Sequence, residues 1–152
     1  MGVSQFFMPS KNILGLGALD EGINQIGQMG YKKALIVTDG ALSKMGLAKT
    51  VADKLAAQGI SADVFDGVQP NPTVGNVNSG LEKLKTAQAD FIISLGGGSS
   101  HDCAKGIGLV TAGGGHIRDY EGIDKSTVAM TPLIAINTTA GTASEMTRFC
   151  II

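Results

Sequence analysis

The sequence predicts an α/β fold in which a mainly parallel sheet is flanked by helices. Short, unbroken apolar runs recur along the chain, stretches with helical spacing separate them, and 22 of the 152 residues are glycine. Apolar runs without polar alternation are typical of strands buried on both faces, and strands that alternate with helices form parallel sheets. A chain of this length is expected to form one domain, which we assign to residues 1–152.

Each element follows from its local pattern. The clearest strands are predicted over 34–38, 91–95 and 133–137, with a weaker strand over 62–65. Helical spacing predicts helices over 47–57 and 77–87 and an apolar helix over 103–110. Residues 69–73 (Gln-Pro-Asn-Pro-Thr) predict a fixed loop at a strand end. Residues 147–152 resemble the start of another strand, so we expect a chain truncated within or just after a strand.

Charge and composition exclude several classes of function. The net charge is −1, with acids and bases interspersed, so nucleic acid is not an expected partner. We expect no membrane span and no secretory signal in residues 1–10. Cys103 and Cys150 have no neighbours at a metal-ligand spacing and are interpreted as reduced core thiols of a cytoplasmic protein. The two histidines, His101 and His116, lack acidic partners at ligand spacing, so no metal site is predicted.

The glycine-rich stretch 96–100 is the strongest single signal for ligand binding. It follows one predicted strand directly and precedes an apolar helix. Glycines let backbone N–H groups approach a phosphate closely, and the N-terminus of the following helix favours its negative charge. Ser99 could add a hydroxyl donor. The alternative is a flexible turn without a ligand, and the strand-loop-helix context favours the phosphate site.

A second polar loop, residues 138–145, follows another predicted strand. It offers three threonine hydroxyls and a glycine at the carboxyl end of that strand, where open parallel sheets bind ligands. The alternative is a helix cap, because Thr142 followed three residues later by Glu145 fits a capping box. Both interpretations are equally consistent with the sequence, and they can coexist.

Two carboxylates accompany these loops. Asp39 follows the strand over 34–38 and could accept a hydrogen bond from an adenosine ribose, which would favour NAD over NADP by repelling a 2′-phosphate. An aspartate in this place is also commonly a turn or cap residue. Asp102 is interpreted as a first-turn carboxylate that compensates the helix dipole.

Taken together, Asp39, the 69–73 loop, the 96–102 loop and the 138–145 loop resemble the iron-containing (group III) alcohol dehydrogenase family in order and spacing. The resemblance includes residues 118–122, covers essentially the whole chain, and is nearest to the ethanol-type and lactaldehyde reductase branch. It implies an N-terminal α/β domain like that of dehydroquinate synthase and glycerol dehydrogenase. In the family an all-helical metal domain follows, and the cofactor lies in the cleft between the two domains.

The resemblance also implies roles for individual residues. It assigns the pyrophosphate loop to Gly97, Gly98 and Ser99 and the ribose contact to Asp39. Further nucleotide contacts are implied at Asn71, Thr138, Thr139, Thr142, Thr147 and Phe149. The family holds Fe²⁺ with one aspartate and three histidines of the helical domain, which is absent from this chain, so no catalytic or metal residue is assigned here.

The resemblance therefore implies the NAD(H)-binding domain of an iron-dependent enzyme that interconverts small primary alcohols and aldehydes by hydride transfer. We expect this chain alone to bind cofactor without turnover, to expose the apolar surface that would meet the helical domain, and to be able to form a homodimer. One alternative is a free-standing nucleotide-binding module or inactive fragment. Another is a protein that binds sugar phosphates or other anions, which would use the same glycine loop without needing Asp39.

Overall fold

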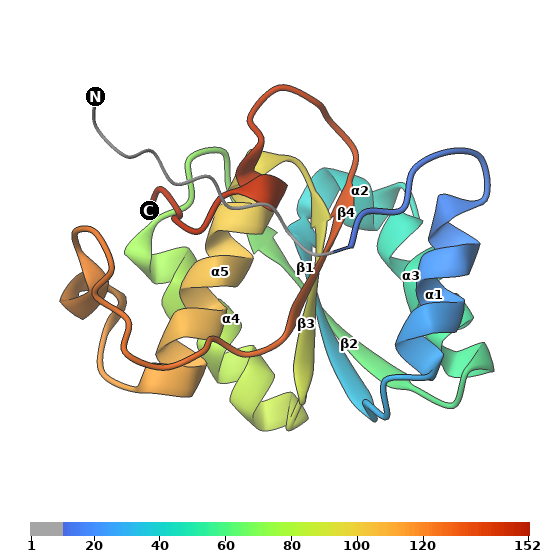
Figure 1. Cartoon of the computed structure of the whole chain (residues 1–152), viewed down its shortest axis with the longest axis horizontal. Helices are drawn as coiled ribbons and strands as arrows, with labels where there is room; N and C mark the ends of the chain where they lie inside the picture. The colour runs from blue at the N-terminus through green and yellow to red at the C-terminus, as the bar shows by residue number, and fades with distance from the viewer. Residues whose placement is uncertain (1–10) are drawn as a thin grey trace, which may run out of the picture.

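Four parallel strands form one sheet that lies between two pairs of helices (Figure 1). The computed structural model describes residues 11–152, so the expectation about residues 1–10 lies outside the described residues. The strands are β1 (Lys33–Asp39), β2 (Ser61–Val68), β3 (Phe91–Gly96) and β4 (Leu133–Asn137). All four predicted strands are confirmed, and β2 is longer than its sequence pattern indicated.

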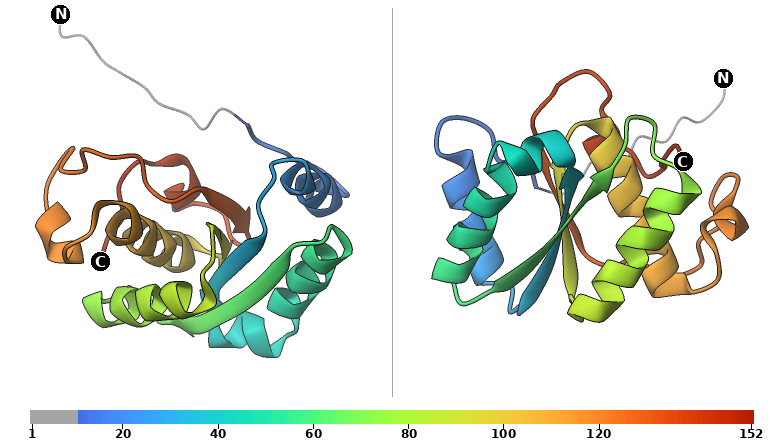
Figure 2. Two further views of the ribbon diagram at one scale, coloured as in Figure 1. Left: turned by 90° about the horizontal axis from the view of Figure 1, so that it is seen from below. Right: turned by 180° about the vertical axis from the view of Figure 1, so that it is seen from behind.

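The helices cover both faces of the sheet (Figure 2). One face carries α1 (Ala18–Gly27) and α3 (Leu47–Ala57), and the other carries α4 (Val74–Ala87) and α5 (Gly98–Gly113). The described residues also form three short helical segments: α2 (Gly40–Lys44), η1 (Ile117–Tyr120) and η2 (Ser144–Met146). The predicted α/β class with a parallel sheet flanked by helices is confirmed.

The strand order is β2-β1-β3-β4, with every neighbouring pair parallel. The chain moves outward from β1 to β2, returns to place β3 on the other side of β1, and continues outward to β4. The direction of winding therefore reverses between β1 and β3. Open parallel sheets bind ligands outside the carboxyl ends of the strands at such a switch point. Here those ends are Asp39 of β1 and Gly96 of β3.

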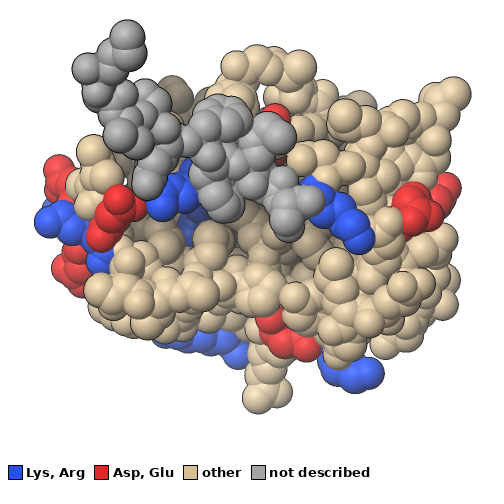
Figure 3. Space-filling model, in the orientation of Figure 1, with Lys and Arg blue, Asp and Glu red and all other residues tan. Residues whose placement is uncertain are grey.

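Acidic and basic side chains are mixed on the face of the molecule seen in Figure 3 and do not form a single basic stripe. Within residues 11–152, no helix is both long and apolar enough to cross a lipid bilayer.

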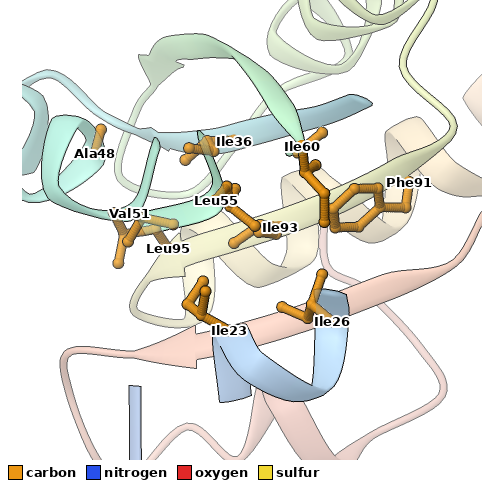
Figure 4. Packing of buried hydrophobic residues seen from close by; sticks show 11 residues of the cluster. Ile23, Ile26, Ile36, Ala48, Val51, Leu55, Ile60, Phe91, Ile93 and Leu95 are labelled. Carbon is orange, nitrogen blue, oxygen red and sulfur yellow. The ribbon is translucent and has the colours of Figure 1, made fainter. Parts of the chain in front are cut away.

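Two apolar clusters hold the layers together, and neighbouring residues of β1 belong to different clusters. Ala34 and Ile36 pack with α1 and α3, whereas Leu35 and Val37 pack with α4 and α5. This alternation explains the continuous apolar run, because successive strand side chains point to opposite faces and both faces are covered. Figure 4 shows the first cluster, in which side chains of α1 and α3 meet Ile36, Ile93 and Phe91 of the sheet.

Two expectations from the sequence are wrong. β4 is not buried on both faces: Leu133, Ile134 and Ile136 are half-buried and Ala135 is exposed, because β4 is the edge strand and pairs only with β3 among the described strands. Residues 147–152 do not begin a strand and have no regular structure. Phe149, Ile151 and Ile152 line a cavity beside α5 and are exposed.

Candidate functional site

The glycine loop and the threonine loop begin side by side at the carboxyl end of the sheet. Gly96, the last residue of β3, pairs with Asn137, the last residue of β4. The N–H of Thr138 donates to the carbonyl oxygen of Gly96 at 2.9 Å. The register of the two strands therefore fixes the loop after Gly96 against the loop after Asn137.

Gly97 and Gly98 allow these two loops to approach each other closely. A Cβ atom at Gly97 would lie 2.6 Å from Oγ1 of Thr139, and one at Gly98 would lie 2.9 Å from Oγ1 of Thr142. Gly97 is the N-cap residue of the 16-residue helix α5. Because glycine has no side chain, the N-cap residue offers no side-chain acceptor to the first N–H groups of the helix. Such an uncapped helix start attracts an anion. The geometry fits the phosphate loop predicted from the sequence.

The 69–73 loop lies against the same helix start. The N–H of Asn71 faces Oγ of Ser99 at 3.3 Å and donates a hydrogen bond to it. Asn71 has a left-handed backbone (φ 55°), a conformation that asparagine tolerates better than most residues. At the end of the loop, Thr73 and Asn76 form a capping box at the start of α4. The Asn76 amide also donates to the carbonyl oxygen of Gly67, which fixes the loop to β2.

These loops surround a cavity of about 800 Å³ beside the N-terminal half of α5. Six of the ten predicted cofactor residues line it: Asn71, Gly98, Ser99, Thr142, Thr147 and Phe149. Gly97, Thr138 and Thr139 lie next to it at the strand ends, as described above. Asp39 lies apart from the cavity, at the end of β1 on the other side of the switch point.

Asp39 acts as a helix cap in this structure. Its Oδ1 atom accepts hydrogen bonds from the N–H groups of Ala41 at 2.8 Å and Leu42 at 2.9 Å, at the start of α2. The capping role that the sequence left open is therefore present. Both bonds use the same carboxylate oxygen. The ribose contact stays a prediction.

Two further interpretations of the sequence are wrong. Thr142 and Glu145 do not form a capping box, because η2 is capped by Ala143 without a side-chain hydrogen bond, and Thr142 instead accepts from the N–H of Ser144 at 3.4 Å. Asp102 is not a first-turn carboxylate, because α5 begins at Gly98 and Asp102 falls in its second turn. Its carboxylate accepts a hydrogen bond from the hydroxyl of Ser144.

Lys105 was missed from the sequence. Its side chain is buried with its ammonium group 3.7 Å from Oδ1 of Asp102 on the same helix. Burial lowers the pKa of Lys105, because the charged form loses its hydration. A lysine three residues after an aspartate, inside the apolar run 103–110, was the available signal, since a buried ammonium group needs a partner.

His101 links three elements of the site. It is 1% exposed, its Nδ1 lies 2.7 Å from Oγ of Ser94, and its Nε2 lies 2.5 Å from Oδ1 of Asn137. Both ring nitrogens are thus engaged within the protein, which leaves neither for a metal ion. Among residues 11–152, no three His, Cys, Asp or Glu side chains are grouped as a metal site requires.

The buried imidazole makes stability depend on pH. Burial lowers the pKa of His101 because the charged ring would be poorly hydrated. The unfolded chain therefore binds this proton at a higher pH than the folded chain does. The free energy of unfolding is expected to fall as the pH drops below about 6.5, by at most about 1.4 kcal/mol per pH unit, and to level off below the folded-state pKa.

Urea denaturation at a series of pH values measures this effect. His101→Gln, which keeps hydrogen-bonding groups but does not titrate, should show a shallower pH dependence than the unsubstituted chain. His116→Gln is the control, because it removes the other histidine and leaves His101 in place. Equal slopes in His101→Gln and the unsubstituted chain would contradict the expectation.

Both cysteines are free thiols. Cys103 is fully buried in the cluster formed by α4 and α5, and this burial raises the pKa of its thiol to about 12. Cys150 is half-buried, and burial raises its pKa as well. The interpretation as a core thiol is confirmed for Cys103 and holds only partly for Cys150.

The fold has known counterparts. Alcohol dehydrogenase 4 of Schizosaccharomyces pombe is 58% identical to the chain over 152 residues, which are 100% of this chain and 36% of the relative. The crystal structure of a 1,3-propanediol oxidoreductase superimposes with a TM-score of 0.93 at 42% identity, covering 98% of this chain and 39% of the other.

A sulfoacetaldehyde reductase from Bifidobacterium kashiwanohense, solved in complex with NAD⁺, superimposes with a TM-score of 0.84 at 30% identity, covering 96% of this chain and 39% of the other. The chain thus spans a little over a third of the length of these proteins. A sequence profile described as iron-containing alcohol dehydrogenase matches residues 9–152, and the chain belongs to that family.

Proposed function

We propose that residues 1–152 form the NAD(H)-binding domain of an iron-dependent alcohol dehydrogenase that interconverts small primary alcohols and aldehydes. The observation that carries this proposal is the uncapped start of α5 at the end of β3, beside the switch point of the sheet, where Gly97 and Gly98 pack against two threonines of the loop after β4. The NAD⁺ complex of the related sulfoacetaldehyde reductase supports the choice of cofactor.

In this proposal each loop has one task. The N–H groups at Gly97 and Gly98 and the hydroxyl of Ser99 bind the pyrophosphate, and the dipole of α5 favours its charge. Asp39 accepts a hydrogen bond from the adenosine ribose. Asn71, Thr138, Thr139, Thr142, Thr147 and Phe149 contact the rest of the nucleotide. The bound nicotinamide supplies the hydride acceptor or donor.

Iron does not fit the residues described. Since no metal-ligand cluster occurs within residues 11–152, we propose that this chain alone binds the cofactor and does not turn over alcohol. A mixture of the chain, NAD⁺, Fe²⁺ and ethanol should then form no NADH. The Fe²⁺ ligands would belong to the longer enzyme.

The nucleotide preference tests the proposal through Asp39. Calorimetric titration of the chain should give saturable NADH binding that is tighter than NADPH binding, because the Asp39 carboxylate repels a 2′-phosphate. In Asp39→Gly we expect the ratio of the two affinities to shift toward NADPH by about tenfold. Glycine is suited to this test because it replaces an aspartate cap at a cost of only a few tenths of a kcal/mol.

Asp39→Asn is the matched variant, because it keeps an oxygen that can cap α2 and removes the charge. If charge sets the preference, both variants should shift in the same direction. The proposal would be overturned if neither nucleotide bound saturably to the unsubstituted chain. Displacement of the bound nucleotide by inorganic phosphate alone would favour a general anion site.

We also propose a cytoplasmic location, where thiols such as Cys103 and Cys150 stay reduced, and a homodimer. Light scattering on the purified chain tests the dimer.

A further inference from the structure

Lys105 places its ammonium group inside the protein, between α5 and residues 144–149. The residue is 5% exposed. Its Nζ donates to the carbonyl oxygen of Phe149 at 2.8 Å, to Oγ1 of Thr147 at 3.1 Å and to Oγ of Ser144 at 3.2 Å. The carbonyl oxygen of Ser144 is a fourth acceptor, so the three N–H groups of the ammonium are shared among four oxygens. One side chain of α5 thus contacts three residues of a segment that follows it by about forty positions.

Asp102 supplies the countercharge for this buried ammonium group. A buried ammonium group is costly unless a countercharge and hydrogen bonds replace its hydration. Oδ1 of Asp102 lies 3.7 Å from the ammonium group and also accepts the hydroxyl hydrogen of Ser144. Asp102 and Lys105 therefore both bind the hydroxyl of Ser144, and their hydrogen bonds are charge-assisted and stronger than neutral ones.

Residues 144–149 have little else to hold them. Within the part of the chain that the structure describes, the hydrogen bonds that join this segment to other helices and strands all go to α5. The ion pair between Arg148 and Asp124 is well exposed, and such pairs contribute little. The single helical turn η2 covers only Ser144–Met146. The position of the segment thus depends on Asp102 and Lys105.

The segment forms one wall of the cavity beside α5. Thr147 and Phe149 line this cavity together with Ser99, whereas Lys105 is not among its lining residues. We infer that Lys105 is a positioning residue: it anchors residues 144–149 to α5 and thereby sets the place of Thr147 and Phe149 in the nucleotide site. Only the effect on the nucleotide site rests on the proposed function. The anchoring of residues 144–149 to α5 does not require a bound nucleotide.

Amide hydrogen exchange of the nucleotide-free chain tests the anchoring. In Lys105→Met, which keeps most of the apolar stem of the side chain but removes the ammonium group, exchange at residues 144–149 should become at least about tenfold faster. Lys49→Met is the matched control, because Lys49 is well exposed on α3 and away from the cavity. Ser144→Ala, which removes one acceptor, should accelerate exchange in the same segment to a smaller extent, and it serves if Lys105→Met fails to fold.

NADH titration tests the consequence for the site. Lys105→Met should raise the Kd for NADH by about tenfold, and by the same factor at low and high ionic strength. A positive charge that acted by attracting the phosphates would instead lose its influence as salt screens it. Lys49→Met should leave the Kd unchanged.

The two measurements separate the inference from the proposed function. Faster exchange only in the Lys105 and Ser144 variants supports the anchoring, even if the unsubstituted chain binds no NADH and the proposed function falls. Unchanged exchange in the folded variants overturns the inference. Faster exchange together with an unchanged Kd, or a Kd effect that disappears at high salt, overturns the positioning role.

Discussion

Gly98→Ala is expected to weaken NADH binding at least about tenfold while leaving the chain folded. The added Cβ would lie 2.9 Å from Oγ1, 3.0 Å from Cγ2 and 3.1 Å from Cβ of Thr142. Rotating the threonine side chain cannot relieve all three contacts, because one of them is made by its Cβ. The loop that carries Thr142 would have to move away from the start of α5, which separates the two halves of the proposed phosphate site.

The backbone itself accepts this substitution. Gly98 is in the first turn of α5, and alanine is a better helix former than glycine. Calorimetric titration with NADH measures the affinity, and circular dichroism confirms the fold. Gly22→Ala is the matched control, since Gly22 is also helical but its added Cβ would meet only Cδ1 of Ile13, at 3.9 Å. An unchanged Kd in Gly98→Ala would show that close packing of Thr142 is not needed for binding.

Phe91→Ala is expected to reduce the free energy of unfolding by about 3–5 kcal/mol. Phe91 begins β3, is fully buried and stacks on Tyr31 with ring centroids 4.6 Å apart. Its ring lies among Ile26, Leu55 and Ile60 (Figure 4). Removing the ring leaves a cavity between the sheet and the helices α1 and α3, and the surrounding layers cannot collapse fully into it.

Urea denaturation followed by far-ultraviolet circular dichroism measures this loss. Tryptophan fluorescence is not available as a signal, because the chain contains no tryptophan. Phe149→Ala is the matched control: its side chain is 65% exposed, and its carbonyl oxygen, which accepts from Lys105, is kept in alanine. We expect that variant to stay within about 0.5 kcal/mol of the unsubstituted chain. A similar loss in both variants would contradict the assignment of the core.

The strands and helices could be predicted because each has a local signal. The runs at 34–38 and 91–95 are apolar at four of their five positions, since both faces of β1 and β3 are covered, and the polar residue in each run, Thr38 and Ser94, is buried as well. The same pattern at 133–137 correctly predicted a strand but did not indicate that this strand is partly exposed. Whether an apolar strand lies at the edge or the centre of a sheet depends on which strands pair, and pairing is not a local property.

Site residues could be predicted where a single loop contains the groups that would bind the ligand. The glycines after β3 point to an anion site on their own. Lys105 could not be placed in the same way, because its partners lie about forty residues later and only the packing of residues 144–149 on α5 brings them together. The proposed capping box at Thr142 was wrong for a related reason: the spacing of the two residues was right, but Ala143 adopts the left-handed conformation and caps η2 instead.

The hydrogen bond from Thr138 to Gly96 is the last link between β3 and β4 and also the base of the proposed phosphate site. Fraying of the edge strand would therefore open the site, and a ligand that binds only the closed form must oppose fraying by mass action. Nucleotide affinity and the pairing of β4 are in this sense a single coupled equilibrium. A substitution at the far end of β4 that loosened the pairing would weaken binding without touching any group that contacts the ligand.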